Sequence, residues 1–378
     1  MKLTTAGESH GKALVAIIEG LPAHLTIDLD KINTDLALRQ SGYGRGARQK
    51  IETDRAEILT GVRNGETLGS PVTLCIYNKD YKNWENCMND GVCDPSVMDA
   101  KKLTRVRPGH ADLTGVIKYA QTDARNVLER ASARETAIRV ASGGVYKAYL
   151  SALGIQIGGY VQEVCGIKDE KVYTFDELSA SKNTRLGMID QDVETLAVEK
   201  IDTLKKEGDT AGGVVEIRVK GLKSGFGNVM TYTEKLDARL AGALMSIQAV
   251  KGVEIGDGFA VAEKSGKYVH DEIYCDGKGY CRKTNRAGGI EGGMSNGEEL
   301  VLRVAMKPIP TLMRGLQTID YETKEKATAS SERSDVCAIF ALEIIAEAVV
   351  AQVLATVVKE RLGGDTMQEV IERYNRLP

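Results

Sequence analysis

Residues 338–362 read AIFALEIIAEAVVAQVLATVVKERL, the most apolar stretch of the chain. Its length would suit a membrane span, but Glu343, Glu347 and Gln352 interrupt it, and charged side chains near the centre of a bilayer are costly. Gly363 follows directly, which is common at the C-terminal end of a helix. We therefore predict a buried helix in the core of a soluble protein.

Two other stretches alternate apolar and polar residues, as strands with one buried face do. They are GGVVEIRVKG at residues 212–221 and ELVLRVAMK at residues 299–307. The buried faces would be formed by Val215, Ile217 and Val219 and by Leu300, Leu302 and Val304.

Two further helices are predicted over residues 132–153 and 236–251, each followed by a glycine. Strands grouped with hairpin-like turns, between long apolar helices, favour an α+β fold over repeating βαβ units. No linker or charge block marks a domain boundary, so we expect a single domain over residues 1–378.

The composition argues against several classes of protein. The 378 residues are 42% hydrophobic and 27% charged, which is ordinary for a globular protein. The net charge of −3 gives no overall basic character for nucleic acid or an acidic membrane, so anion recognition must come from local clusters. The N-terminus lacks a secretory pattern, and seven scattered cysteines without a C-x-x-C pair favour neither disulfides nor zinc. We expect a cytoplasmic protein with no metal site.

The first chemical motif is GESHG at residues 7–11, which contains His10. It formally satisfies the G-x-S-x-G nucleophile elbow of α/β-hydrolases, with Ser9 as nucleophile. Only six residues precede it, too few for the sheet on which such an elbow sits. The alternative is a histidine exposed where the backbone approaches a ligand closely.

A second histidine, His110, follows a Pro-Gly turn in RVRPGHAD at residues 105–112. Arg105 and Arg107 come just before it, and residues 101–139 contain nine Lys and Arg against four Asp and Glu. This local positive excess on a net acidic chain predicts an anion site near His110.

Arginines also lie in two further motifs. RQSGYGRGAR at residues 39–48 spreads three of them through a glycine-rich loop, and guanidinium groups bind phosphate and carboxylate in bidentate fashion. ERASARETA at residues 129–137 places Arg130 and Arg134 at a predicted helix start, where backbone N–H groups favour anions. A solvated basic loop and a salt-bridged helix face stay open as alternatives.

Three motifs lie late in the chain. NRAGGIEGGMSNG at residues 285–297 could let the backbone pass close to a flat ring or a phosphate, and KPIPT at residues 307–311 follows a predicted strand. ERSD at residues 332–335 precedes the last helix, where Asp335 could be the N-cap or a base.

Taken together, these segments resemble chorismate synthase over essentially the whole chain. The motifs are GESHG, RPGHAD, ERASARETAIRVASG, MSIQAVKGVEIGDGF, NRAGGIEGGMSNG, KPIPT and ERSD, in the family's order and spacing. The resemblance implies a 1,4-anti elimination of phosphate from 5-enolpyruvylshikimate 3-phosphate, giving chorismate. It also implies reduced FMN without net redox change, NADPH only as an indirect source of reducing equivalents, a homotetramer, and a β-α-β sandwich with central helices between antiparallel sheets.

The resemblance further implies the roles of individual residues. His10 would protonate the reduced flavin or hold its charge state. His110 would protonate or hydrogen-bond the departing phosphate, and Asp335 would deprotonate flavin N5. The substrate-binding residues would be Arg39, Arg45, Arg48, Arg107, Arg134 and Arg333. The cofactor-binding residues would be Arg130, Ala131, Ser132, Gln248, Ala249, Gly292, Lys307, Pro308, Ile309, Pro310, Thr311 and Arg333.

Two other functions stay open on the residues alone: a serine hydrolase acting through Ser9 and a non-catalytic polyanion-binding protein. No reductase domain is visible, which favours dependence on a separate flavin reductase. Residues 84–97, WENCMNDGVCDPSV, carry Cys87 and Cys93 and have no functional interpretation from the sequence.

Overall fold

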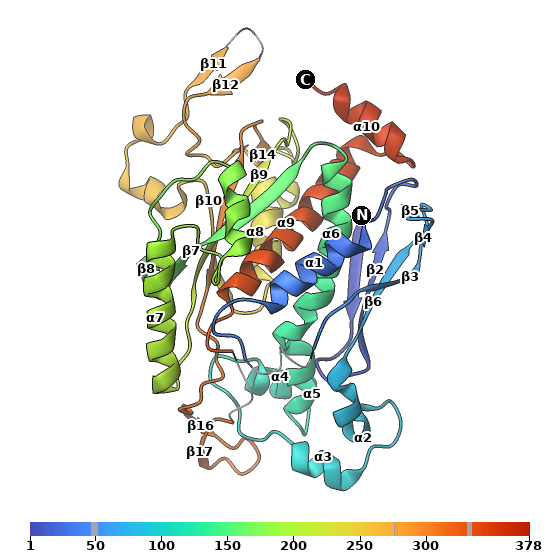
Figure 1. Ribbon diagram of the computed structural model, residues 1–378, viewed down its shortest axis with the longest axis vertical. Helices are drawn as coiled ribbons and strands as arrows, with labels where there is room; N and C mark the ends of the chain where they lie inside the picture. The colour runs from blue at the N-terminus through green and yellow to red at the C-terminus, as the bar shows by residue number, and fades with distance from the viewer. Residues whose placement is uncertain (47–51, 276, 278, 331–334) are drawn as a thin grey trace.

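The structure is a computed structural model in which residues 1–46, 52–275, 277, 279–330 and 335–378 are described. Two antiparallel sheets contain most of its longer strands (Figure 1). The first sheet has the order β1 (Lys2–Ala6), β2 (Ala13–Glu19), β6 (Val72–Tyr77), β3 (Glu57–Thr60). The second has the order β10 (Val250–Ile255), β15 (Leu300–Met306), β9 (Gly213–Lys220), β7 (Gln156–Val164), β8 (Ile167–Lys168).

Short ribbons and helices complete the described part of the fold. The ribbons are β4 (Val62–Arg63) with β5 (Glu66–Thr67), β11 (Ile273–Cys275) with β12 (Tyr280–Arg282), β13 (Ile290–Glu291) with β14 (Met294–Ser295), and β16 (Gln317–Ile319) with β17 (Lys326–Thr328). The α-helices are α1 (Leu29–Gln40), α2 (Glu85–Met88), α3 (Pro95–Lys101), α4 (Asp112–Tyr119), α5 (Arg125–Ala131), α6 (Thr136–Ser151), α7 (Gln191–Glu207), α8 (Leu236–Met245), α9 (Ile339–Leu362) and α10 (Met367–Asn375).

The two stretches predicted as strands pair with each other. Val215 lies opposite Val304, and Ile217 opposite Leu302, in the antiparallel register of β9 and β15. These side chains are fully buried. The alternating pattern therefore identified both strands and their buried faces, because successive side chains of a strand point to opposite sides of the sheet.

Helix α9 is the buried helix predicted from residues 338–362, and it ends at Gly363. Its two carboxylates are paired inside the molecule: Glu347 lies 2.7 Å from Lys147 and 2.9 Å from Lys182, and Glu343 also pairs with Lys182. By length and composition α9 could span a membrane, but 89% of its most apolar window is buried in the protein. A core helix of a soluble protein has this character.

Helices α6 and α9 cross closely at the centre of the molecule. A Cβ atom at Gly143 in α6 would lie 2.3 Å from the Cβ of Ala348 in α9, so only glycine allows this approach. Helix α6 contacts β2 and β6, whereas α9 contacts β7 and β9 (Figure 1). The mixture of helices and antiparallel sheets is consistent with the predicted α+β class.

Two helix boundaries differ from the sequence prediction. A short 3-10 turn (Ala133–Glu135) precedes α6, which begins at Thr136 instead of residue 132. The prediction for residues 236–251 ran six residues too far, because α8 ends at Met245. Ala249 then adopts a left-handed conformation (φ 69°) that no α-helix continues, and Gly252 lies in β10.

Candidate active site

A cavity of about 920 Å³ gathers most of the sequence motifs. Its walls come from the β1–β2 loop, the end of α1, the junction of α5 and α6, the turn before α4, the segment after β15 and the start of α9. Eight Lys and Arg residues but only three Asp and Glu residues are among the described residues that line it. The cavity therefore has the charge to attract a small polyanion.

The cavity brings together most of the predicted site residues. Those that line it are His10, Arg39, Arg45, Arg107, His110, Ala131, Ser132, Arg134, Gln248, Ala249, Lys307, Ile309, Pro310, Thr311 and Asp335. Arg48 and Arg333 lie outside the described residues. Arg130, Gly292 and Pro308 are not among the lining residues.

Arg130 and Gly292 occupy other places in the fold. The Arg130 guanidinium is exposed and donates to the backbone carbonyls of Thr5 and Gly7, both at 3.2 Å. It therefore stabilises the start of the GESHG loop without lining the cavity. Gly292 lies in the turn of the β13–β14 ribbon, and Figure 1 shows β14 in the upper half of the molecule, with α4 and α5 in the lower half.

His110 is held by a carboxylate two residues away. Its Nδ1 lies 2.6 Å from Asp112 Oδ1, and Arg107 donates to both oxygens of Asp112 at 2.8 and 3.0 Å. Arg107 also donates to Thr311 Oγ1 at 3.1 Å, which links the turn to the KPIPT segment. Burial by itself would raise the pKa of Asp112, but the hydrogen bonds and charges of His110 and Arg107 bring that pKa well below its usual range.

His10 is held by a carboxylate from a distant part of the sequence. Its Nδ1 lies 2.9 and 3.0 Å from the two carboxylate oxygens of Glu129 in α5, and its backbone N–H donates to the same carboxylate at 2.8 Å. The opposing effect of burial is again outweighed, because the hydrogen bonds and charge of His10, with the charge of Arg125, lower the pKa of Glu129. Both histidines thus use Nδ1 toward a carboxylate.

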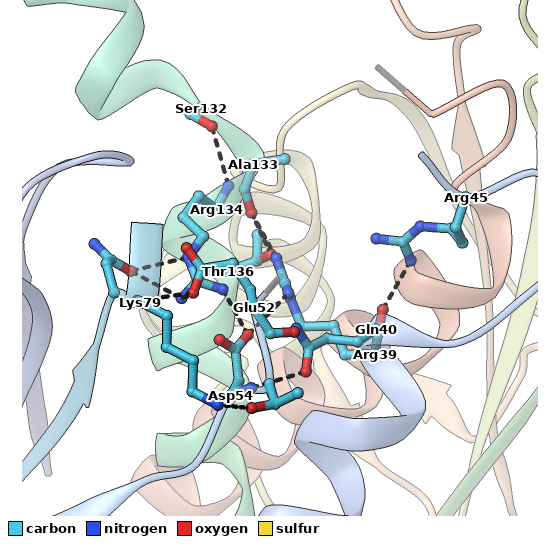
Figure 2. A network of polar contacts seen from close by, with 12 residues as sticks. Arg39, Gln40, Arg45, Glu52, Asp54, Lys79, Ser132, Ala133, Arg134 and Thr136 are labelled. Atoms are coloured by element: carbon cyan, nitrogen blue, oxygen red, sulfur yellow. Dashed lines mark hydrogen bonds and ion pairs between the residues drawn. The ribbon is translucent and has the colours of Figure 1, made fainter. Parts of the chain in front are cut away.

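Two arginines of the cavity share one carboxylate (Figure 2). Arg134 Nη1 donates to Asp54 Oδ2 at 2.6 Å, and Arg39 Nη1 lies 3.6 Å from the same oxygen. Arg134 also donates to Asn78 Oδ1, and Arg39 to Thr136 Oγ1. Burial lowers the pKa of Arg39 to about 9, against the attraction of Asp54, so its guanidinium is still protonated at neutral pH. Glu52 Oε2 also lies 3.6 Å from Arg134 Nη2, so two buried carboxylates hold the two guanidiniums at this wall.

Asp335 belongs to the Arg45 loop and not to the helix that follows it. It accepts a hydrogen bond from the Gly46 N–H at 2.6 Å and lies 3.0 Å from Arg45 Nε. The N-cap of α9 is Ala338, which makes no side-chain cap, so the N-cap interpretation of Asp335 was wrong. Gly44 has φ 84° and accepts from Val336 N–H, which ties the loop to this segment.

The wall formed by Gln248 and the KPIPT segment fits a flat heterocycle with N–H donors. The side-chain oxygen of Gln248 is buried and, within the described part of the chain, has no hydrogen-bond partner. A buried acceptor without a partner is costly, and a ligand donor would satisfy it. The strained φ of the adjacent Ala249 is of a kind that occurs at binding sites.

Sequence reasoning missed Trp84, Asp54 and the roles of Glu129 and Asp112. Trp84 stacks on His10 with ring centroids 3.9 Å apart and planes inclined by 25°. Glu129 and Asp112 stand inside the ERASARE and RPGHAD motifs, so the motifs contained the signal, but no pattern indicated which histidine each carboxylate would meet. No motif in the sequence indicated a role for Asp54.

These features define the class of protein: an enzyme that binds a small, multiply charged anion and can move protons through two imidazoles. The particular family is shown by similarity to known proteins. The family profile described as chorismate synthase matches residues 1–358, and the chain belongs to this family.

Curated relatives and a solved structure agree. Chorismate synthase of Geobacter sulfurreducens is 53% identical over 387 residues, covering 99% of this chain and 97% of that protein. The enzyme of Caldicellulosiruptor bescii is 51% identical over 382 residues, covering 100% and 99%. A crystal structure of chorismate synthase matches with a TM-score of 0.79 at 39% identity, covering 99% of this chain and 96% of that one.

The function follows from these findings. The protein is a carbon–oxygen lyase that eliminates phosphate from 5-enolpyruvylshikimate 3-phosphate to give chorismate, a step of the shikimate pathway. The family implies a small-molecule substrate and a reduced flavin cofactor. The serine-hydrolase and binding-only alternatives are wrong, and Ser9 lies in a loop between two strands instead of a strand-to-helix elbow.

Proposed function

We propose that this cavity is the active site and that His110 and His10 divide the proton transfers between them, at the phosphate and at the flavin. The observation that carries the proposal is that both rings line one cavity while a buried carboxylate holds Nδ1 of each. Nε2 is then the ring nitrogen that can meet a bound molecule, at His110 beside Arg107 Nη2, which lies 3.4 Å away. A positioned imidazole typically contributes about 10²–10⁴-fold to a proton-transfer step.

His110 is the acid for the departing phosphate. Asp112 and Arg107 hold its ring in a fixed orientation beside the cavity. Arg107 itself lines the cavity and can meet the phosphate as charge develops on it.

Arginines bind the substrate, which carries a phosphate and two carboxylates. Arg39, Arg45, Arg107 and Arg134 supply fixed positive charge from three walls of the cavity. Arg48 and Arg333 are added on the resemblance alone. The shared partner Asp54 keeps Arg39 and Arg134 in place before substrate binds.

The flavin is proposed to be FMN, held by the lining residues Ala131, Ser132, Gln248, Ala249, Lys307, Ile309, Pro310 and Thr311 and, on the resemblance, by Arg130, Gly292, Pro308 and Arg333. The chemistry that a reduced flavin supplies is a temporary donation of electron density to the allylic system of the substrate. With the flavin bound, His10 would hold the charge state of the ring, and Asp335 would accept the proton from N5, so that N5 could take up the hydrogen that the substrate loses. Gln248 Oε1 is suited to accept a hydrogen bond from the ring.

Other parts of the proposal concern the whole molecule. The chain is taken as a single domain over residues 1–378 with a β-α-β sandwich. The contacts support it, because α6 packs mainly on β2 and β6 of the first sheet, with a smaller contact to β7, and α9 packs on β7 and β9 of the second. We also propose a cytoplasmic homotetramer that relies on a separate flavin reductase, with NADPH only as the indirect source of electrons.

One assay tests the function directly. Under anaerobic conditions, purified protein with 5-enolpyruvylshikimate 3-phosphate and pre-reduced FMN should release phosphate and form chorismate, and oxidised FMN should give neither. Phosphate release that is independent of reduced flavin would overturn the proposal.

Asp335 offers a sharper test of the proton assignment. Asp335→Asn keeps an acceptor for the Gly46 N–H but removes the base, so turnover should fall by about 10²-fold with substrate affinity within a few-fold of wild type. Single-turnover kinetics and equilibrium binding separate the two quantities. Loss of binding with unchanged turnover would make Asp335 a structural residue.

A further inference from the structure

We infer that Glu129 and Trp84 are positioning residues that together fix the imidazole of His10, Glu129 along its edge and Trp84 across its face. The inference rests on the proposed role of His10 for its catalytic consequence, but the geometry that it predicts can be measured without turnover.

Glu129 fixes the edge of the ring and its tautomer. One oxygen accepts from Nδ1, while the other accepts from the backbone N–H of His10 and also lies 3.0 Å from Nδ1. The carboxylate is only 2% exposed, and the backbone carbonyl of Glu129 accepts from Ser9 N–H at 2.9 Å. A carboxylate has no proton to donate, so Nδ1 must carry the hydrogen and Nε2 presents its lone pair in the neutral ring.

Trp84 fixes the plane of the ring. The indole stacks on the imidazole, and its own position is set by two further contacts: Nε1 donates to Asp80 Oδ2 at 3.2 Å, and Lys101 Nζ lies 3.7 Å from the indole centroid. An aromatic ring that is anchored at its edge and covered by a cation cannot easily turn. Trp84 is also a lining residue of the cavity, so it limits access of water to one face of His10.

This arrangement assigns a role to the start of the segment 84–97. Trp84 precedes α2, and Lys101 is the last residue of α3, so the two helices lie between the residues that meet at the indole. Arg125, in the same helix as Glu129, has its guanidinium carbon 5.0 Å from the indole centroid and its Nη1 3.5 Å from Glu129. The segment therefore closes the His10 side of the cavity.

The chain offers a convenient probe of the tautomer, because it has only four histidines. In flavin-free protein labelled with ¹⁵N-histidine, at roughly pH 9 where ordinary imidazoles are neutral, the two ring nitrogens give distinct signals for N–H and bare nitrogen. His10→Asn assigns the signals of His10. We expect wild-type His10 as the Nδ1–H tautomer.

Glu129→Gln is the decisive variant, because it keeps the shape of the side chain but has a single acceptor oxygen. Its NH₂ group must face Nδ1–H or the backbone N–H of His10, so the Nδ1–H tautomer should lose its dominance, as in a solvated imidazole that populates both forms. Asp112→Asn is the matched control, which should change the signals of His110 and leave those of His10 in place. A His10 that is Nε2–H in wild type, or unchanged in Glu129→Gln, overturns the inference.

Kinetics with pre-reduced FMN test the catalytic consequence. Glu129→Gln should lower kcat by about 10–10²-fold, as loss of an orienting partner commonly does, with KM for substrate within about three-fold. Trp84→Leu should lower kcat by about ten-fold, and Trp84→Phe, which restores a stacking face, should recover most of it. Wild-type kcat in Glu129→Gln and Trp84→Leu would overturn the positioning role even if the tautomer is as expected. Absence of turnover in wild type would instead contradict the proposed function.

Discussion

The two histidines of the cavity reach similar geometry by different routes. His110 takes its carboxylate, Asp112, from two residues away, and Arg107 from the same turn binds that carboxylate at both oxygens. His10 takes Glu129 from 119 residues away in sequence, across the packing of the β1–β2 loop on α5. The first pair is built by local chain geometry, and the second exists only once the molecule has folded.

The difference also concerns what lies around each ring. His110 has a guanidinium bound to its carboxylate and a threonine of the KPIPT segment beyond it. His10 has an aromatic face, Trp84, and Lys101 and Arg125 lie over that indole. The environment of His110 therefore suits an acid that hands its proton to a phosphate, whereas that of His10 suits a ring held in one orientation.

Removing His110 should have the largest effect. His110→Ala with pre-reduced flavin is expected to lower kcat by about 10²–10⁴-fold, the range of a lost general acid. Phosphate release under anaerobic conditions measures it. His24→Asn is a suitable control, because His24 is exposed and has φ 63°, a conformation that asparagine tolerates. Turnover within a few-fold of wild type in His110→Ala would remove the acid role.

A matched pair of arginine changes tests the two surroundings against each other. Arg107→Lys loses the hydrogen bonds to both carboxylate oxygens of Asp112 and the hydrogen bond to Thr311. Because lysine cannot replace a bidentate guanidinium, kcat/KM should fall by about 10²-fold. Arg125→Lys disturbs a 3.5 Å contact with Glu129 and the hydrogen bond from Nε to the Lys101 carbonyl, but it leaves the contacts between His10 and Glu129 in place, so its effect should stay below about ten-fold. Steady-state kinetics of both variants give the two values of kcat/KM. Equal losses of kcat/KM would contradict the difference between the surroundings of His110 and His10.

The two carboxylates should also make stability depend on pH. Asp112 and Glu129 both have pKa values lowered in the folded protein, so each contributes stability that is present above its unfolded pKa, about 4, and is lost as pH falls through the folded value. Urea unfolding should therefore show stability that falls on acidification from about pH 5 toward about pH 2, whereas these two carboxylates leave it unchanged between about pH 5 and 7.

Variants at the two carboxylates should show how much each one contributes to the pH dependence of stability. Asp112→Asn should flatten the acid decline more than Glu129→Gln, because Arg107 donates two hydrogen bonds of 2.8 and 3.0 Å to Asp112, whereas Arg125 lies 3.5 Å from Glu129. The urea midpoints of the variants, compared with wild type at each pH, give this difference. An acid decline as steep in Asp112→Asn as in wild type would show that the carboxylate is not responsible.

Much of the fold could be predicted because it follows local patterns. The alternation of Val215, Ile217 and Val219 identified β9, and the apolar run before Gly363 identified α9. The end of α8 could not be predicted, because residues 246–251 are compatible with a helix and only the pairing of β10 with β15 turns the chain at Ala249.

The residues of the site also divide into those that local motifs predict and those that only the folded structure brings together. The motifs named the cavity residues Arg39, Arg107 and His110 from the sequence, since clustered arginines and Gly-flanked histidines indicate anion chemistry. Asp54 and Trp84 gave no such signal, because an isolated acid or tryptophan is compatible with many environments.

The sequence by itself determined the family, the α+β class and the presence of two histidines among arginines. Only the tertiary structure decided that both histidines enter one cavity, that Asp54 lies between Arg39 and Arg134, and that Glu129 and Trp84 meet His10. The physical reason is that motifs and periodicity record contacts within a turn or an element, whereas these contacts join elements whose approach depends on the packing of the whole core.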